Sequence, residues 1–253
     1  MTMAENREWV VIVGATGALG AVMVERFLAR GFGVVAVARS ESALQALTAR
    51  YPGLVSCVAD IGQDESVEKI RDALPGQVRM VVHGPGVSVG GGVLNIATSA
   101  LVDAVNIKVG GMLRLVRAVD GHLQRDSRLV AVGGHYGFEP TAYAAAAGVA
   151  NAALVNVVRQ LSLAYGERGI TAHLVAPGPA DTERLRRVAA DRARLQETTV
   201  DAVLASMLSE SSIHAFTEPG QVAWALEMLL APEASAMTGS SLMLDAGRRR
   251  GLP

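Results

Sequence analysis

The chain alternates short, continuously apolar runs with longer segments in which apolar residues recur at helical spacing. Seven runs have strand length: Trp9–Val13, Val34–Ala38, Val55–Val58, Met80–Val82, Leu129–Val132, Thr171–Val175 and Leu242–Leu244. They are rich in valine and do not alternate apolar with polar residues, which is typical of strands covered on both faces. The helical segments are expected at Ala18–Arg30, Ser42–Ala49, Glu65–Ala73, Ala100–Leu123, Tyr143–Arg168 and Glu218–Leu230.

This alternation predicts βαβ units, and therefore an α/β fold with a Rossmann-type, doubly wound parallel sheet of about seven strands in a single domain, residues 1–253. One stretch, residues 182–213, is helical in pattern, rich in arginine, and has no strand partner. We interpret it as a helical insertion within the domain. It would either lie over the carboxyl ends of the strands as a substrate lid or form a solvated helical pair, and the pattern fits both equally.

The charge balance and the cysteine and histidine content argue against several classes of function. The chain has 23 Lys and Arg against 24 Asp and Glu, whereas a nucleic-acid binder normally carries a basic excess. Its single cysteine cannot form an internal disulfide, and its five histidines lack metal-ligand spacing. No stretch reads as a secretory signal or a membrane span. We therefore expect a cytoplasmic protein without a nucleic-acid, membrane or metal partner.

A glycine-rich loop directly follows the first predicted strand and opens a helix. It contains Gly14, Thr16, Gly17, Leu19 and Gly20. Glycines let the backbone turn tightly and approach a pyrophosphate, and the helix N-terminus offers free N–H groups and a favourable dipole. In this βαβ context, the loop predicts a dinucleotide site.

The end of the second predicted strand indicates which dinucleotide. An NAD site places a carboxylate there for the ribose 2′-hydroxyl, but this chain has Arg39 and Ser40. An arginine can pair bidentately with a 2′-phosphate, and the serine adds a donor. The sequence thus predicts NADP(H) in preference to NAD(H). The alternative is an arginine that caps a surface turn.

With these residues the chain resembles the short-chain dehydrogenase/reductase family over nearly its whole length. Further matching motifs are Asp60-Ile61 after the third strand, Asn106 in a helix, Tyr143 opening a long helix, Pro177–Thr182, and the ending Met237–Gly247. The resemblance implies an oxidoreductase that forms a homodimer or homotetramer. It also implies cofactor contacts from Asp60, Ile61, Pro177, Gly178 and Thr182, and from His83, Gly84 and Pro85, which replace the family's Asn-Asn-Ala-Gly motif.

The family's chemistry uses a tyrosine as general acid/base, a serine that hydrogen-bonds the substrate, and a lysine four residues after the tyrosine. Tyr143 and Asn106 match two positions of this tetrad, but the lysine position is Ala147 and the serine position falls on Gly133-Gly134. Lys69 and Lys108 are far away in sequence, so we expect no neighbouring replacement for the lysine.

The remaining polar residues allow a reduced proton relay. Without a cation beside it, Tyr143 is expected to be protonated at neutral pH, which suits a general acid in reduction better than a base in oxidation. Tyr136 and His135 follow the double glycine, and either could reach a substrate oxygen. Alternatively, Tyr136 packs against the insertion and His135 faces water.

Three functions are compatible with a retained cofactor site and a proton relay that lacks the family's serine and lysine. The first is an NADP(H)-dependent, ketoreductase-like oxidoreductase that acts on a carbonyl of a small, polyketide-like metabolite. The second is a non-redox enzyme on the same scaffold, such as a cyclase, isomerase or dehydratase. The third is a catalytically silent subunit that pairs with an active homologue, since the alanine-rich helix suits close packing between subunits. Few aromatic residues and the arginine-rich insertion fit an anionic or polyketide-like ligand, but a solvated helix would look the same.

Overall fold

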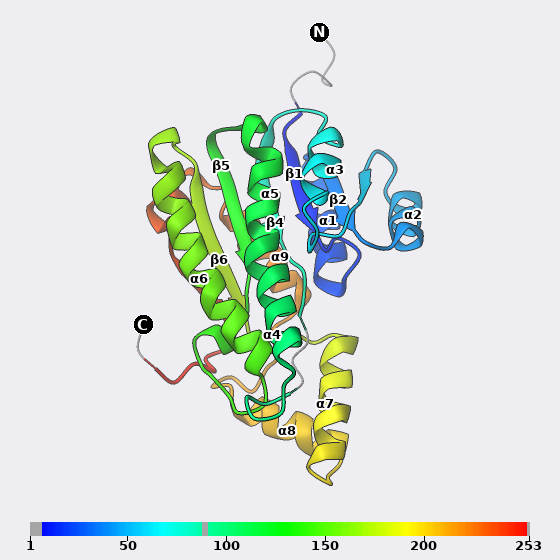
Figure 1. Ribbon diagram of the computed structural model, residues 1–253, viewed down its shortest axis with the longest axis vertical. Helices are drawn as coiled ribbons and strands as arrows, with labels where there is room; N and C mark the ends of the chain where they lie inside the picture. The colour runs from blue at the N-terminus through cyan, green and yellow to red at the C-terminus, as the bar shows by residue number, and fades with distance from the viewer. Residues whose placement is uncertain (1–6, 88–90, 252–253) are drawn as a thin grey trace.

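The computed structural model describes residues 7–87 and 91–251, and its centre is one seven-stranded sheet (Figure 1). The strands are β1 (Trp9–Val13), β2 (Gly33–Ala38), β3 (Val55–Val58), β4 (Val78–His83), β5 (Leu123–Val132), β6 (Thr171–Pro177) and β7 (Ser241–Leu244). Their order is β3-β2-β1-β4-β5-β6-β7, and all neighbours are parallel. This confirms the predicted doubly wound sheet. The strand order reverses at β1 and β4, where such sheets bind ligands.

Helices cover both faces of the sheet. On the near face in Figure 1 lie α3 (Ser66–Asp72), α4 (Thr98–Val105), α5 (Gly111–Val119) and α6 (Ala145–Tyr165). On the other face lie α1 (Ala18–Ala29), α2 (Glu41–Arg50) and α9 (Pro219–Met228). Alternate residues of β1 belong to two different hydrophobic cores. Val11 and Val13 face one helix layer, and Val10 and Ile12 face the other. Burial on both faces explains the continuous apolar runs.

The segment predicted as one helix over Ala100–Leu123 is divided, and that expectation was wrong. After α4 come a π turn (Asn106–Gly110), α5 and a 3₁₀ turn (Asp120–His122), and β5 begins at Leu123 rather than Leu129. The start of β5 was hidden by its charged residues. One of them, Arg128, is fully buried because its guanidinium donates hydrogen bonds to three backbone carbonyls, those of Asp126, Leu229 and Ala231.

The arginine-rich stretch forms two helices, α7 (Glu183–Leu195) and α8 (Val200–Ser209), at one end of the molecule (Figure 1). They pack on each other through a small apolar cluster: Leu185, Ala189, Ala193, Val203 and Met207. The first turns of α7 also border the larger of the two cavities described below. The helices are therefore joined to the ligand-binding end of the sheet.

Within residues 7–87 and 91–251, no helix is long and apolar enough to cross a membrane. In the same ranges, no group of three or more His, Cys, Asp or Glu side chains is placed to hold a metal ion. Cys57 is a buried free thiol.

Candidate functional site

The glycine loop after β1 has a geometry that only glycine allows at two positions. Gly14 has φ +86°, and a Cβ on Gly20 would lie 2.2 Å from the carbonyl oxygen of Gly14. The following helix, α1, begins at an N-cap glycine, Gly17, with no side-chain cap and no acidic residue in its first turn. Its N–H groups and dipole are thus available to an anion. The loop fits a pyrophosphate.

A cavity of about 260 Å³ lies beside this loop. Its lining includes Gly14, Thr16, Gly17, Arg39, Asp60, Ile61, Gly84 and Pro85. The Oδ1 atom of Asp60 accepts a hydrogen bond from the Gly62 N–H at 2.9 Å, which fixes the carboxylate at the cavity wall. Arg39 is exposed and forms no ion pair with any residue that the structure describes. Its guanidinium is free to meet a phosphate.

Ser40 has a different position from the one expected. Its hydroxyl accepts a hydrogen bond from the Ala43 N–H at 3.2 Å and so caps the N-terminus of α2. It does not line either cavity in the described parts of the chain. Serine is a favoured N-cap residue for this reason, and a cap is the role that the geometry supports.

A second cavity, of about 460 Å³, shares its glycine wall with the first. Gly14, Gly17, Gly84, Pro85 and Gly86 line both. The larger cavity continues past Leu19, Gly20, Pro177, Gly178 and Thr182 toward Tyr136. The two cavities therefore adjoin along these residues at the carboxyl ends of the central strands, and their combined size is typical of small-molecule sites.

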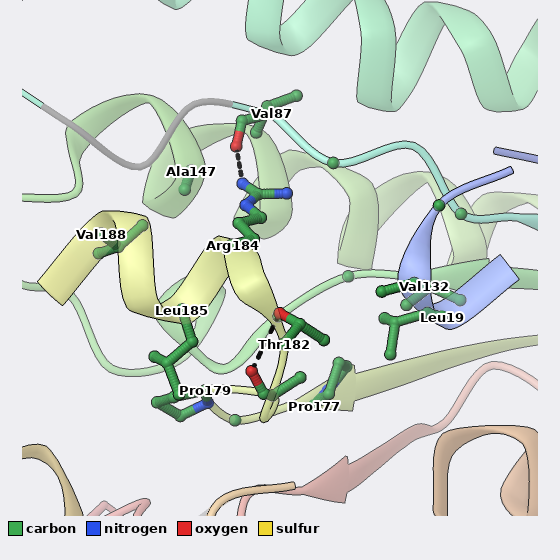
Figure 2. A pocket seen from close by; sticks show the side chains of 18 of the residues that line it. Leu19, Val87, Val132, Ala147, Pro177, Pro179, Thr182, Arg184, Leu185 and Val188 are labelled. Atoms are coloured by element: carbon green, nitrogen blue, oxygen red, sulfur yellow. Dashed lines mark hydrogen bonds between the residues drawn. The ribbon is translucent and has the colours of Figure 1, made fainter. Parts of the chain in front are cut away.

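Helix α7 closes the far side of the larger cavity, as Figure 2 shows. The guanidinium of Arg184 reaches across and donates a hydrogen bond to the carbonyl of Val87, while Leu185 and Val188 line the wall. Arg187 also lines this cavity. The sequence allowed a lid at this edge of the sheet, but it could not predict the Arg184–Val87 contact, whose partners are 97 residues apart.

Two tyrosine hydroxyls form a pair at the edge of the larger cavity. The Oη atoms of Tyr136 and Tyr143 are 2.9 Å apart, and the Arg192 guanidinium lies 3.4 Å from the Tyr143 Oη and 4.3 Å from its ring centroid. Of the two, Tyr136 lines the cavity and Tyr143 does not. The expectation that Tyr143 has no cation beside it was wrong, because α7 carries Arg192 to it from a distant part of the chain.

Burial raises the pKa of Tyr136 above its ordinary value, and the hydrogen bond with Tyr143 adds to this. His135 is 4% exposed, so the alternative that it faces water was wrong. Burial, with the nearby charge of Arg248, lowers the pKa of His135 to about 4. At neutral pH the tyrosine therefore carries its proton and the histidine is uncharged.

Two residues expected in the site lie beneath it. His83 is fully buried, its Nε2 lies 3.0 Å from the carbonyl oxygen of Ile107, and burial lowers its pKa to about 3. Asn106 donates from Nδ2 to the carbonyl of Gly62 at 2.9 Å and accepts from Arg114 at 2.9 Å. In the described chain neither lines either of these two cavities. The contacts instead place these side chains against the π turn and its neighbouring loop, so their roles in the site stay predictions.

Lys108 extends from the π turn into the larger cavity. We expected no replacement for the family lysine from Lys108, because it is far from Tyr143 along the chain. Its Nζ donates to the carbonyl of Val132 at 2.8 Å, and the residue is 4% exposed. Burial, with a smaller contribution from the charge of Arg184, lowers the pKa of Lys108 to about 7. The available signal was a lone lysine between apolar residues, Ile107 and Val109.

Gly133, Gly134 and Ala147 also line the larger cavity, at the positions where the resemblance to the family predicts its serine and lysine. Asn151, one helical turn after Ala147, lines it too and is 5% exposed. A Cβ on Gly134 would lie 3.0 Å from the Asn151 Nδ2 atom. The Asn151 amide therefore occupies space next to the position where the serine would be.

Comparison with known proteins agrees with this geometry. The family model described as enoyl-(acyl carrier protein) reductase matches residues 14–249. The 3-oxoacyl-[acyl-carrier-protein] reductase FabG of Escherichia coli (strain K12) is 27% identical over 244 residues, covering 94% of this chain and 95% of that protein. The short-chain reductase protein NovJ of Streptomyces niveus is 26% identical over 265 residues, covering 97% and 96%. The crystal structure of BdcA in complex with NADPH is 25% identical, with a TM-score of 0.82 over 97% of this chain and 96% of that chain. The chain belongs to the short-chain dehydrogenase/reductase family.

Proposed function

We propose that the protein is an NADP(H)-dependent oxidoreductase that reduces the ketone of a small molecule. The observation that carries this proposal is the pair of adjoining cavities. Arg39, which has no ion-pair partner among the described residues, lines one of them, and Tyr136 lines the other. Arg39 would bind the 2′-phosphate, the glycine loop the pyrophosphate, and Pro177, Gly178 and Thr182 the nicotinamide half. When bound, the reduced cofactor supplies the electrons and hydrogen that a ketone carbon takes up.

Side chains of the protein supply the proton that the alkoxide oxygen takes up. Tyr136 donates its hydroxyl proton to the developing alkoxide oxygen, Tyr143 passes a proton to Tyr136 across their 2.9 Å contact, and water later restores the relay. The Arg192 guanidinium stabilises the negative charge left on Tyr143 in between. A raised pKa keeps Tyr136 protonated but makes it a weak acid, so turnover is expected to be slow.

The relatives and the arginines of α7 support a proposal for the substrate class. FabG of Escherichia coli is named as a 3-oxoacyl-[acyl-carrier-protein] reductase. In the described chain, Arg184 and Arg187 line the larger cavity without an acidic partner within ion-pair distance. A 3-oxoacyl thioester with an anionic carrier group fits both, with α7 and α8 as its lid. Polyketide-like ketones are the next class to assay.

Cofactor titration tests the first half of the proposal. We expect fluorescence titration to show tighter binding of NADPH than of NADH, and Arg39→Asp to weaken NADPH far more than NADH. Equal effects on the two cofactors would remove the assigned role of Arg39. Failure of the wild-type protein to bind either cofactor would refute the reductase proposal.

Turnover tests the second half. Tyr136→Phe is expected to lower kcat about 10²- to 10⁴-fold on a 3-oxoacyl thioester while the NADPH Kd stays unchanged. Tyr51→Phe, which removes a hydroxyl that contacts Glu25 at 3.0 Å on the surface, is the matched control. Full activity of Tyr136→Phe would show that another group supplies the proton.

A second candidate function is a cofactor-binding subunit that has no redox turnover of its own. It is supported by the glycines and alanine at the positions where the resemblance predicts the family serine and lysine. Its signature is NADPH binding with no reduction of any ketone until a homologue is added. The exposed apolar side chains of Val102 on α4, Val149 on α6 and Leu163 on α6 offer a face for either a second copy or a homologue. Sedimentation of the purified chain, with Leu163→Asp as the disrupted variant, distinguishes a homo-oligomer from a monomer that awaits its partner.

A further inference from the structure

A buried cation enters the larger cavity at Lys108. The structure shows it 4% exposed, with one hydrogen-bond acceptor, the Val132 carbonyl, and no ion pair among the described residues. An ammonium has three donors, so two remain for a ligand. Lysine is rarely this buried unless it is paired. An apolar residue of similar length would avoid this cost, and the retained charge therefore points to a ligand.

Lys108 enters the same cavity as Ala147, the position where the resemblance predicts the family lysine. Ile107, next to Lys108 in the π turn, packs against the apolar cluster to which Ala146, Ala147 and Ala150 of α6 belong. The small side chains of α6 let this turn approach closely. π-Bulges occur often at functional sites, where they redirect side chains. Val132, which fixes the ammonium, lies at the end of β5, directly before Gly133 and Gly134.

We propose that Lys108 takes over the task of the missing lysine: its ammonium binds a ribose hydroxyl in the nicotinamide half of NADP(H). The inference rests on the proposed cofactor-dependent reduction. The charges facing Lys108 are consistent with it. Arg184 on α7 is also a cation, and His83 on β4 is neutral at pH 7 because burial lowers its pKa. In the described chain the charge of Lys108 is therefore met by no protein carboxylate at ion-pair distance.

Binding measurements on Lys108→Met test the role directly. Loss of a charge-assisted hydrogen bond is expected to raise the Kd of NADPH roughly 10- to 100-fold. The Kd of 2′,5′-ADP, which lacks the nicotinamide half, is expected to stay the same, and this result also shows that the variant is folded. The control is Lys69→Met, which removes an exposed lysine on α3. An unchanged NADPH Kd in Lys108→Met would overturn the proposal.

A relocation variant makes the test sharper. Ala147→Lys in the Lys108→Met background is expected to recover most of the lost NADPH affinity, because it returns one cation to the same cavity. Ala147→Lys alone is expected to bind no better than wild type, since two ammonium groups would then compete for one cavity. A gain in affinity from the single variant would contradict the inference. Wild-type protein that binds neither NADPH nor 2′,5′-ADP would instead refute the proposed function.

An independent observation concerns Asn151. Its Oδ1 atom is buried without a hydrogen-bond partner in the described chain, and its Nδ2 atom lies 3.0 Å from the ideal Cβ position of Gly134. The unpartnered Oδ1 atom is costly, and in the described chain Nδ2 donates no hydrogen bond that would offset this cost. Because Asn151 lines the cavity, its amide group is available as a donor to a ligand there. We propose that Asn151 replaces the missing serine and that its Nδ2 donates a hydrogen bond to the substrate oxygen.

This assignment predicts a kinetic split. With a 3-oxoacyl thioester, Asn151→Ala is expected to lower kcat/KM at least tenfold while leaving the NADPH Kd unchanged, and the exposed Asn156→Ala on the same helix is expected to change neither. Gly134→Ser in the Asn151→Ala background is expected to restore activity, because removal of the amide makes room for the serine. Equal kcat/KM in Asn151→Ala and wild type would overturn the assignment. Wild type without turnover would refute the proposed reduction itself.

Discussion

Replacing the buried lysine by methionine is expected to stabilise the cofactor-free protein, by an amount that depends on pH. Burial lowers the pKa of Lys108 from 10.5 to about 7, so the folded state disfavours the charged ammonium that the unfolded chain carries. The unfolded state binds more protons between these two values. Stability of the wild type therefore rises as pH increases through this interval, and the penalty is largest below pH 7.

The magnitude follows from the two pKa values. At 1.36 kcal/mol for each pH unit of difference, the charged lysine destabilises the fold by about 5 kcal/mol at low pH. This penalty falls to about 4 kcal/mol at pH 7 and about 2 kcal/mol at pH 9. Loss of the 2.8 Å hydrogen bond to the Val132 carbonyl costs about 1 kcal/mol at every pH and so cancels from the comparison.

Urea unfolding of the cofactor-free wild type and Lys108→Met at pH 7 and pH 9 measures the effect. We expect the stability advantage of the variant to shrink by about 2 kcal/mol between the two pH values. His83 does not interfere, because a histidine whose pKa is lowered stays neutral in this window. The surface variant Lys69→Met is expected to show no such change. An advantage that is constant with pH would refute the assignment of a buried, charged lysine.

Three further predictions concern the scaffold. Gly20→Ala is expected to destabilise the fold by several kcal/mol and to abolish NADPH binding, because its Cβ would lie 2.2 Å from a backbone oxygen. The control is Gly220→Ala, whose Cβ would meet no described atom within 4 Å; urea unfolding is expected to show it as neutral or stabilising by about 0.5 kcal/mol. Arg128→Met is expected to destabilise by roughly 2 kcal/mol because the carbonyls of Leu229 and Ala231 each lose a donor, whereas that of Asp126 keeps Arg79. A urea midpoint equal to wild type would contradict this. Burial lowers the pKa of His83 to about 3 and of His173 to about 4. Their contribution to the free energy of unfolding is therefore complete above pH 6.5 and is lost as pH falls toward those values. His173→Gln is expected to flatten the fall in thermal midpoint between pH 6.5 and 4.5.

Most of the residues that line the smaller cavity could be predicted because their signals are local. The glycine loop, Arg39 and Asp60 each follow the end of a strand, and the carboxyl ends of parallel strands meet at one edge of the sheet. The central strands could be predicted because they are buried on both faces, which gives continuous apolar runs; the charged start of β5 could not. Ser40 was the exception, since a serine after a strand serves equally well as a helix cap.

The sequence by itself determined the fold and the family, because the strand pattern and the family motifs depend on residues that are close along the chain. Only the tertiary structure decided which side chains line the cavity beside the predicted cofactor loop. The π turn directs Lys108 rather than Asn106 into the cavity, α6 brings Asn151 beside Gly134, and α7 sets Arg192 on Tyr143. These contacts join elements far apart in sequence. Which side chains meet there depends on helix rotation and packing, and a local pattern of apolar and polar residues does not specify either.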